Sequence, residues 1–339
     1  MSDPFAMATR MINASICAYN IFEDGAIPPS GPPISRRVPS SAADSFYQVV
    51  PTYQDAVGFA QPSSEYAPAF FASGSDDIDA ALIGPTADGN VVVAIRGTIP
   101  PSFKNNDLLA WVTDWINDAK IVPHSWDPAG THYGHVEHGF GDATLALWPW
   151  VKETLEPLLA NLSGTVLVTG HSKGGAMTYL VASLIRETWP ELDGRIEVHA
   201  FAPAVAIDRA FLKEYAAKGL ANKTTRYQVQ NDIVPFLPFW SDANVWAEIT
   251  FSGWAHELEW TAAVEAFRLA TGGGYTVAGD FKYFDSAHRF VPEAKVGTSA
   301  LRAVAQALNE KQYAMIAKAH SAVDSYLPCF APSAVAGAD

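Results

Sequence analysis

An apolar segment that ends at a serine between glycines is the feature that most constrains the fold. Residues 165–169 are apolar or β-branched, and Ser172 follows between Gly170 and Gly174. Residues 175–185 then place apolar side chains at helical spacing. A strand that turns sharply into a helix needs residues without a Cβ beside the turn, because neighbouring backbones approach closely there. The pattern therefore predicts a strand, a tight turn that carries Ser172, and a helix.

A Gly-x-Ser-x-Gly turn in this context is typical of a nucleophilic serine. The helix N-terminus beneath it supplies free N–H groups and partial positive charge, which stabilise an anion at an attacked carbonyl. The alternative is a glycine-rich turn with a structural serine, because the five-residue pattern is common by chance. The strand before Ser172 and the helix after it favour the nucleophile.

The composition predicts a globular chain. With 339 residues, of which 49% are hydrophobic and 17% charged, it can bury a large core, and we expect a single domain over 1–339. No apolar run is long enough for a transmembrane helix, and the N-terminus shows no signal-peptide pattern. A net charge of −14 argues against nucleic acid and against electrostatic docking on anionic membranes, but not against neutral lipid.

Strand-like and helical segments alternate along the chain. The strands are expected at 90–95, 195–201 and 224–230, with a further pair within 275–284. Helices are expected at 4–22, 142–161, 257–270 and 299–319, although Pro149 and Pro157 should break or bend the second. This alternation predicts an α/β fold, in which helices cover both faces of a mostly parallel sheet.

A serine nucleophile needs a base and a carboxylate that orients the base. In folds built around this turn, the chain order is serine, then acid, then histidine. Four histidines follow Ser172, namely His199, His256, His288 and His320. His199 lies inside a strand pattern, whereas His320 follows the last helical segment, where a loop-borne base is expected. We therefore predict His320 as the base.

The candidate acid is Asp232, which directly follows the strand at 224–230. Its competitors are Asp208 and Asp285. Asp208 is better explained as the cap of a helix over 209–218, and Asp285 comes late for the usual order. A turn aspartate that bonds its own backbone is the alternative for Asp232.

With these residues identified, the chain resembles the class 3 lipases, the family of the filamentous-fungal triacylglycerol lipases. The resemblance rests on short motifs that occur in the family's order, at 92–98, 113–118, 136–140, 168–175, 201–203, 231–235 and 320–327. It implies an α/β-hydrolase fold with a mostly parallel central sheet, and Ser172, Asp232 and His320 as the catalytic triad. It also implies that Thr98 and Lys173 supply the oxyanion-hole N–H groups, with no metal or organic cofactor.

Three features depart from the fungal pattern. A lysine occupies position 173, where fungal members usually carry an apolar residue, and its charge could favour polar or anionic acyl groups. Extra residues over 99–109 separate Thr98 from the 113–118 motif. An aromatic-rich region near 238–272 lengthens the segment between Asp232 and His320.

The segment 100–112 is predicted to be a lid. A short helix is expected there, and its apolar side consists of Phe103, Leu108, Leu109 and Trp111. Such a side can cover an active site or contact lipid. A fixed surface helix is the alternative.

The expected function is triacylglycerol hydrolysis at a lipid–water interface. A soluble carboxylesterase or feruloyl-type esterase and a phospholipase are alternatives on the same scaffold, and a non-catalytic binding module is a remote one.

The resemblance favours a secreted protein, although no signal peptide is visible. It also implies a possible Cys17–Cys329 disulfide, for which the alternative is two buried free thiols.

His132, His135 and His138 have a spacing that metals can use. Gly134 and Gly139 argue for a loop there rather than one helical face, so no metal site is predicted from this spacing.

Overall fold

The described strands form one twisted sheet with a parallel centre. The computed structural model describes residues 5–19, 36–37, 56–60, 69–73, 79–98, 123–237, 274–296 and 299–330. The sheet has the strand order β1 (Arg36–Arg37), β2 (Ala69–Ser73), β3 (Asp79–Pro85), β4 (Val91–Ile95), β7 (Val166–His171), β8 (Ile196–Phe201), β9 (Thr224–Val229), β10 (Asp280–Phe284) and β11 (Phe290–Val291). Strands β4, β7, β8, β9 and β10 run parallel, whereas β1 to β3 and β11 join antiparallel at the two edges.

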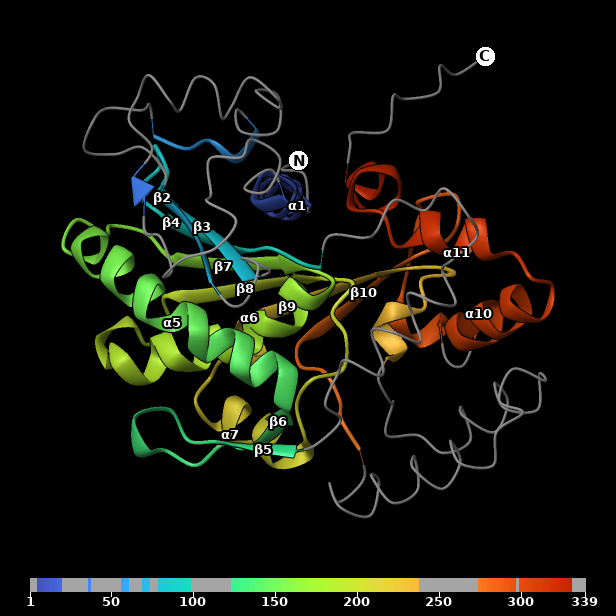
Figure 1. Cartoon of the computed structure of the whole chain (residues 1–339). Helices are drawn as coiled ribbons and strands as arrows, with labels where there is room; N and C mark the ends of the chain where they lie inside the picture. The colour runs from blue at the N-terminus through green and yellow to red at the C-terminus, as the bar shows by residue number, and fades with distance from the viewer. Residues whose placement is uncertain are drawn as a thin grey trace.

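Helices cover both faces of this sheet (Figure 1). Helix α1 (Ala6–Tyr19) packs on one face, and α5 (His138–Leu159) and α6 (Lys173–Thr188) pack on the other. Further α-helices are α7 (Arg209–Ala217), α10 (Ser299–Asn309) and α11 (Tyr313–Ala319), and a π-helix follows at Ala322–Tyr326. A separate antiparallel hairpin of β5 (Pro123–Trp126) and β6 (Gly134–Glu137) leads directly into α5.

The central strands are buried on both faces, which explains their continuous apolar sequences. In β4, Val91, Val93 and Ile95 pack into the core beneath α5 and α6. The intervening Val92 and Ala94 pack into the core beneath α1. Successive side chains of a strand point to opposite faces, so one short run of sequence serves two cores. The predicted α/β-hydrolase fold is therefore confirmed.

Helix α5 differs from the sequence prediction, since it begins at His138 and continues through Pro149 and Pro157. Both prolines are exposed. A proline frees the carbonyl four residues earlier, here those of Leu145 and Glu153, which are also exposed. Water can hydrogen-bond these carbonyls, so the helix continues where a buried one would end. None of the described helices is long and apolar enough to cross a membrane.

Glu137 fixes the start of α5. Its buried carboxylate accepts the Phe140 N–H at 2.8 Å, as the N-cap of the helix. Burial raises the pKa of the Glu137 carboxyl to about 7, although the Phe140 and Gly139 N–H groups and the charge of Lys173 act in the opposite direction. Folding therefore favours the protonated acid.

This burial makes stability depend on pH. The Glu137 carboxyl is protonated in both states below its ordinary pKa of 4.5. Between 4.5 and about 7 only the unfolded chain releases the proton, so the folded state loses stability as pH rises, by about 3 kcal/mol in total. In Glu137→Gln, which keeps an acceptor for Phe140, this loss should disappear.

Urea unfolding at pH 4.5, 6 and 8 measures the difference in unfolding free energy between Glu137→Gln and the parent chain. The matched control is Glu153→Gln, on the exposed side of α5, which should leave the pH dependence unchanged. The burial argument is contradicted if the difference in unfolding free energy between Glu137→Gln and the parent stays constant from pH 4.5 to pH 8.

Candidate active site

The turn at Ser172 joins β7 to α6 and has strained backbone geometry. Ser172 has φ 61° and ψ −128°, a conformation that side-chain-bearing residues rarely adopt. A Cβ on Gly170 would collide with the Gly174 carbonyl, and a Cβ on Gly174 would collide with the Ile95 carbonyl of β4. A Cβ on Gly175 would lie 2.7 Å from the carbonyl oxygen of Phe201 in β8. The glycines therefore allow three backbone segments to meet beneath the serine.

Ser172, His320 and Asp232 form a continuous hydrogen-bonded chain. The Ser172 Oγ lies 2.8 Å from His320 Nε2, and His320 Nδ1 lies 3.0 Å from each carboxylate oxygen of Asp232. Asp232 is fully buried, and the His320 side chain is 15% exposed. These contacts join residues 148 and 88 positions apart in the sequence. The structure thus brings together the three residues that the sequence analysis selected.

Two other donors hold the Asp232 carboxylate. The Val234 N–H donates to Oδ1 at 3.0 Å, and the Tyr326 hydroxyl donates to Oδ2 at 2.5 Å. Tyr326 is fully buried and also accepts the Val229 N–H at 3.3 Å. Sequence reasoning missed Tyr326, although it lies six residues after His320. Its position in the 320–327 motif was the one signal that could have identified it.

His171 packs beside His320, the predicted base. Its ring lies 4.7 Å from that of His320, between centroids, and its Nδ1 lies 2.9 Å from the Tyr19 hydroxyl. Burial, and then the nearby His320, hold the pKa of His171 well below its usual range. A neutral His171 avoids repulsion when His320 takes up a proton.

The two residues predicted to form the oxyanion hole flank the turn. Strand β4 pairs with β7 so that Ile95 lies opposite Gly170, and Thr98 follows three residues later. Lys173 is the first residue of α6, so its N–H has no carbonyl partner within the helix. Both positions fit donors to an anion formed at Ser172, and their role stays a prediction.

The rejected alternatives lie elsewhere. His199 is buried in β8 and contacts the Tyr227 hydroxyl and Glu197, as a sheet residue. Asp208 caps α7 by accepting the Phe211 N–H at 2.7 Å, which confirms the predicted role. Asp285 pairs with Arg289 in an exposed turn that also contains His288.

Comparison with known proteins agrees with this geometry. The sequence profile of the family Lipase (class 3) matches residues 92–242, which include Thr98, Ser172 and Asp232. The resemblance to the class 3 lipases is therefore confirmed. The match supports a serine ester hydrolase. No protein of known sequence and curated function matches the chain.

Solved structures of fungal lipases share the fold. A fungal lipase matches with a TM-score of 0.51 at 18% identity, over 88% of this chain and 85% of its own. The MDLA protein of Penicillium cyclopium, solved as a variant, matches with a TM-score of 0.50 at 18% identity, over 88% and 86%. Lipase II from Rhizopus niveus gives a TM-score of 0.48 at 16% identity, over 82% and 80%. At these identities the likeness concerns the fold alone.

Several predictions from the sequence concern residues outside the described ranges. The proposed lid at 100–112, with Phe103, Leu108, Leu109 and Trp111, is one of them. The aromatic-rich region near 238–272 with His256, the extra residues 99–109 and the 113–118 motif also lie outside these ranges.

Lys173 does not offer a free charge beside the nucleophile. Its Nζ lies 2.5 Å from Oδ1 of Asp79, at the start of β3, and the two side chains are 16% and 7% exposed. The pairing argues against a selection of anionic acyl groups by Lys173, because a buried carboxylate already neutralises the charge. Only the backbone N–H of Lys173 remains for an oxyanion.

The disulfide suggested by the fungal resemblance is also absent, since Cys17 and Cys329 are both free and buried. The Cys329 thiol lies 3.1 Å from the Ser325 carbonyl, to which it donates. Burial raises the pKa of both thiols to about 12, so neither is reactive.

Tyr326→Phe should lower kcat/KM for an ester substrate by about tenfold or more, because hydrogen bonds to charged groups contribute about 1.5–3 kcal/mol. The ring is retained, so the packing beside His171 is conserved. Steady-state hydrolysis of a soluble p-nitrophenyl ester measures the effect. The control is Tyr215→Phe on α7, which removes a buried hydroxyl bonded to Thr224 of β9. Equal losses in the two variants would contradict a specific role for Tyr326.

Asp79→Asn should destabilise the fold by about 3–5 kcal/mol, because it leaves the Lys173 ammonium buried without a counter-ion. Lys173→Met combined with Asp79→Asn should recover most of this loss. Lys173→Met alone keeps the backbone N–H, so its turnover should remain near that of the parent. Denaturant unfolding and ester turnover test the two statements. No recovery in the double variant rejects the coupling, and a large turnover loss in Lys173→Met assigns the side chain a catalytic role.

Proposed function

We propose that this ester hydrolase cleaves fatty-acid esters through an acyl-enzyme on Ser172, with triacylglycerols as the favoured substrates. The observation that carries the proposal is the hydrogen-bonded chain from the Ser172 Oγ through His320 to the buried Asp232. Each of its contacts is within the distance that proton transfer requires.

Acylation begins when the Ser172 Oγ bonds to the ester carbonyl carbon and its proton passes to His320 Nε2. The Asp232 carboxylate keeps the Nδ1–H tautomer of His320 and stabilises the imidazolium that forms. Collapse of the tetrahedral intermediate breaks the bond to the alcohol. His320 returns its proton to the departing oxygen, which leaves the acyl group on Ser172.

Deacylation repeats these steps with water. His320 Nε2 removes a proton from water as the water oxygen bonds to the acyl carbon. The second tetrahedral intermediate then releases the carboxylic acid, and the Ser172 Oγ recovers its proton from His320. No metal or organic cofactor enters either half-reaction.

The N–H groups of Thr98 and Lys173 are assigned to the negative oxygen of both intermediates. The N-terminus of α6 adds partial positive charge at the same place. Removal of one such donor typically costs about 3 kcal/mol of transition-state stabilisation.

Fatty-acid esters are favoured because the family model that matches the chain is that of the class 3 lipases, and a solved structure that shares the fold is named as a fungal lipase. A soluble esterase or a phospholipase would use the same triad. Initial rates on p-nitrophenyl esters from acetate to palmitate, and on emulsified triacylglycerol and phospholipid, separate these substrate classes.

Ser172→Ala should reduce ester turnover by several orders of magnitude, because triad members act as a unit. Alanine keeps the Cβ of serine, so the strained turn should be unchanged. Asp232→Asn should also be severe, since it removes the charge that stabilises the imidazolium.

Asp285→Asn is the matched control, because this aspartate pairs with Arg289 in an exposed turn. Its kcat/KM for p-nitrophenyl butyrate should stay near the parent value. Near-normal turnover in Asp232→Asn, with loss in Asp285→Asn, would reverse the assignment of the acid.

The lid prediction has its own kinetic signature. If the 100–112 segment covers the site and opens on lipid, the rate should rise sharply once a triglyceride such as tributyrin exceeds its solubility. Leu108→Ser/Leu109→Ser should weaken this rise and leave the rate on dissolved substrate unchanged. Plain saturation through the solubility limit, the same in parent and variant, would reject the lid and favour the soluble esterase.

A further inference from the structure

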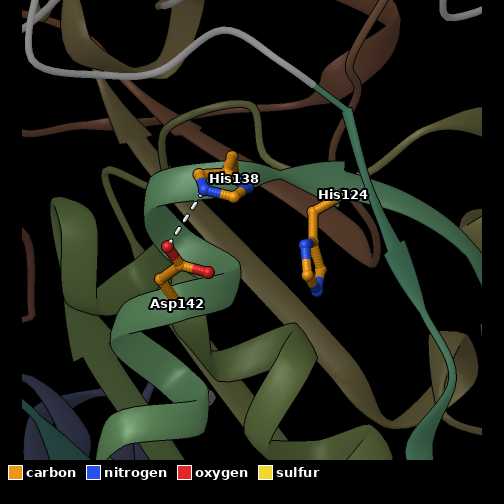
Figure 2. A group of neighbouring side chains, drawn as sticks. All are labelled: His124, His138 and Asp142. Carbon is orange, nitrogen blue, oxygen red and sulfur yellow. Dashed lines mark ion pairs between the residues drawn. The ribbon is translucent and has the colours of Figure 1, made fainter.

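Two histidines and an aspartate gather at the start of α5 (Figure 2). His124 comes from β5, His138 is the first residue of α5, and Asp142 lies one turn later. One potential ligand atom from each side chain lies within 4.8 Å of the other two. His138 Nε2 lies 3.1 Å from Oδ2 of Asp142.

Regular structure holds all three positions. Strand β5 pairs with β6 so that His124 lies opposite Val136, two residues before His138. The His124 and His138 rings lie 5.4 Å apart, between centroids, at 63°. A Cβ built on Gly141 would lie 3.6 Å from Cδ2 of His124, so this imidazole packs closely over the first turn of α5. The hairpin and the helix thus orient the side chains towards one another.

We propose that His124, His138 and Asp142 bind a divalent metal ion of the zinc class. Two imidazole nitrogens and one carboxylate oxygen suit Zn²⁺ and its neighbours Co²⁺, Ni²⁺ and Cu²⁺, whereas Ca²⁺ and Mg²⁺ prefer oxygen ligands alone. Three protein ligands leave the fourth tetrahedral position to water.

The separations fit such an ion. Ligands about 2.0–2.1 Å from a tetrahedral Zn²⁺ lie about 3.3 Å from one another. The 3.1 Å between His138 and Asp142 is close to this value. The other ligand atoms lie up to 4.8 Å apart. Small side-chain rotations would bring them to the distance that the ion requires, because none of the three side chains is fully buried.

The neighbouring histidines have different partners. His132 Nδ1 lies 2.6 Å from Asp127, and His135 Nδ1 lies 3.1 Å from Asp208, which caps α7. Within the described part of the chain, three metal-ligating side chains gather only around His138. The site therefore differs from the His132, His135 and His138 spacing that is visible in the sequence.

A metal ion here would connect the start of β5 to the first turn of α5. The positive end of the helix dipole opposes a cation weakly, and the Asp142 carboxylate, near the start of α5, offsets it. Because the unfolded chain does not hold the three ligands together, binding should stabilise the folded state.

The test uses the full chain without a histidine tag, stripped with EDTA and transferred to metal-free buffer. Calorimetric titration with Zn²⁺ should give one saturable site per chain, and Co²⁺ should give the visible absorption bands of a tetrahedral complex. Affinity should fall at least tenfold in His124→Ala and in Asp142→Asn. His132→Ala is the matched control, because it removes a histidine–aspartate pair from the same hairpin, and it should bind like the parent.

Thermal unfolding adds a readout that is independent of catalysis. Zn²⁺ should raise the Tm of the parent and of His132→Ala, but not that of Asp142→Asn. The Asp142 side chain is 54% exposed, so this variant should fold and decides the test even if His124→Ala does not fold. Absence of saturable binding below millimolar Zn²⁺ overturns the proposal. Binding that persists in Asp142→Asn, or that falls equally in His132→Ala, also overturns it.

Discussion

The close approach of three backbone segments beneath Ser172 is the constraint on which the rest of the site depends. Gly170, Gly174 and Gly175 let β7, β4 and β8 meet where a side chain would collide with a carbonyl group. This contact holds Ser172 at a positive φ. The same turn begins α6, so one local arrangement presents both the hydroxyl and the helix N-terminus. The strained backbone conformation of Ser172 persists because the surrounding sheet imposes it.

The proposed acid and base reach this turn through the overall fold. Asp232 follows β9, and His320 follows α11 near the end of the described chain. Tyr326 joins them, since its hydroxyl bonds both Asp232 and the last residue of β9. Phe330 then packs against Tyr227 of β9 and Phe201 of β8, with ring centroids 5.2 and 5.7 Å apart. The segment after His320 is therefore part of the core, and the position of the base depends on tertiary packing.

The sequence predicts best what depends on local patterns. The strand, turn and helix around Ser172 come from spacing alone, and chain order selects Asp232 and His320. The ion pair of Lys173 with Asp79 joins residues 94 positions apart, so no local pattern indicates it. Helix α5 continues through Pro149 because the carbonyl that this proline frees is on an exposed residue. That exposure depends on tertiary structure, so the sequence pattern does not reveal it. The free Cys17 and Cys329 differ from the fungal resemblance, because a disulfide requires a geometry that family motifs do not fix.

The central claim is that Ser172 is the nucleophile and that its partners activate it. A long-chain alkyl phosphonate p-nitrophenyl ester, which traps a catalytic serine as a covalent adduct, tests this directly. Intact-protein and peptide mass spectrometry should find one adduct per chain, on the peptide that contains Ser172. The rate of p-nitrophenol release should fall by orders of magnitude in His320→Ala, while the fold is retained. An adduct on another residue, or labelling of His320→Ala at the parent rate, would contradict the account.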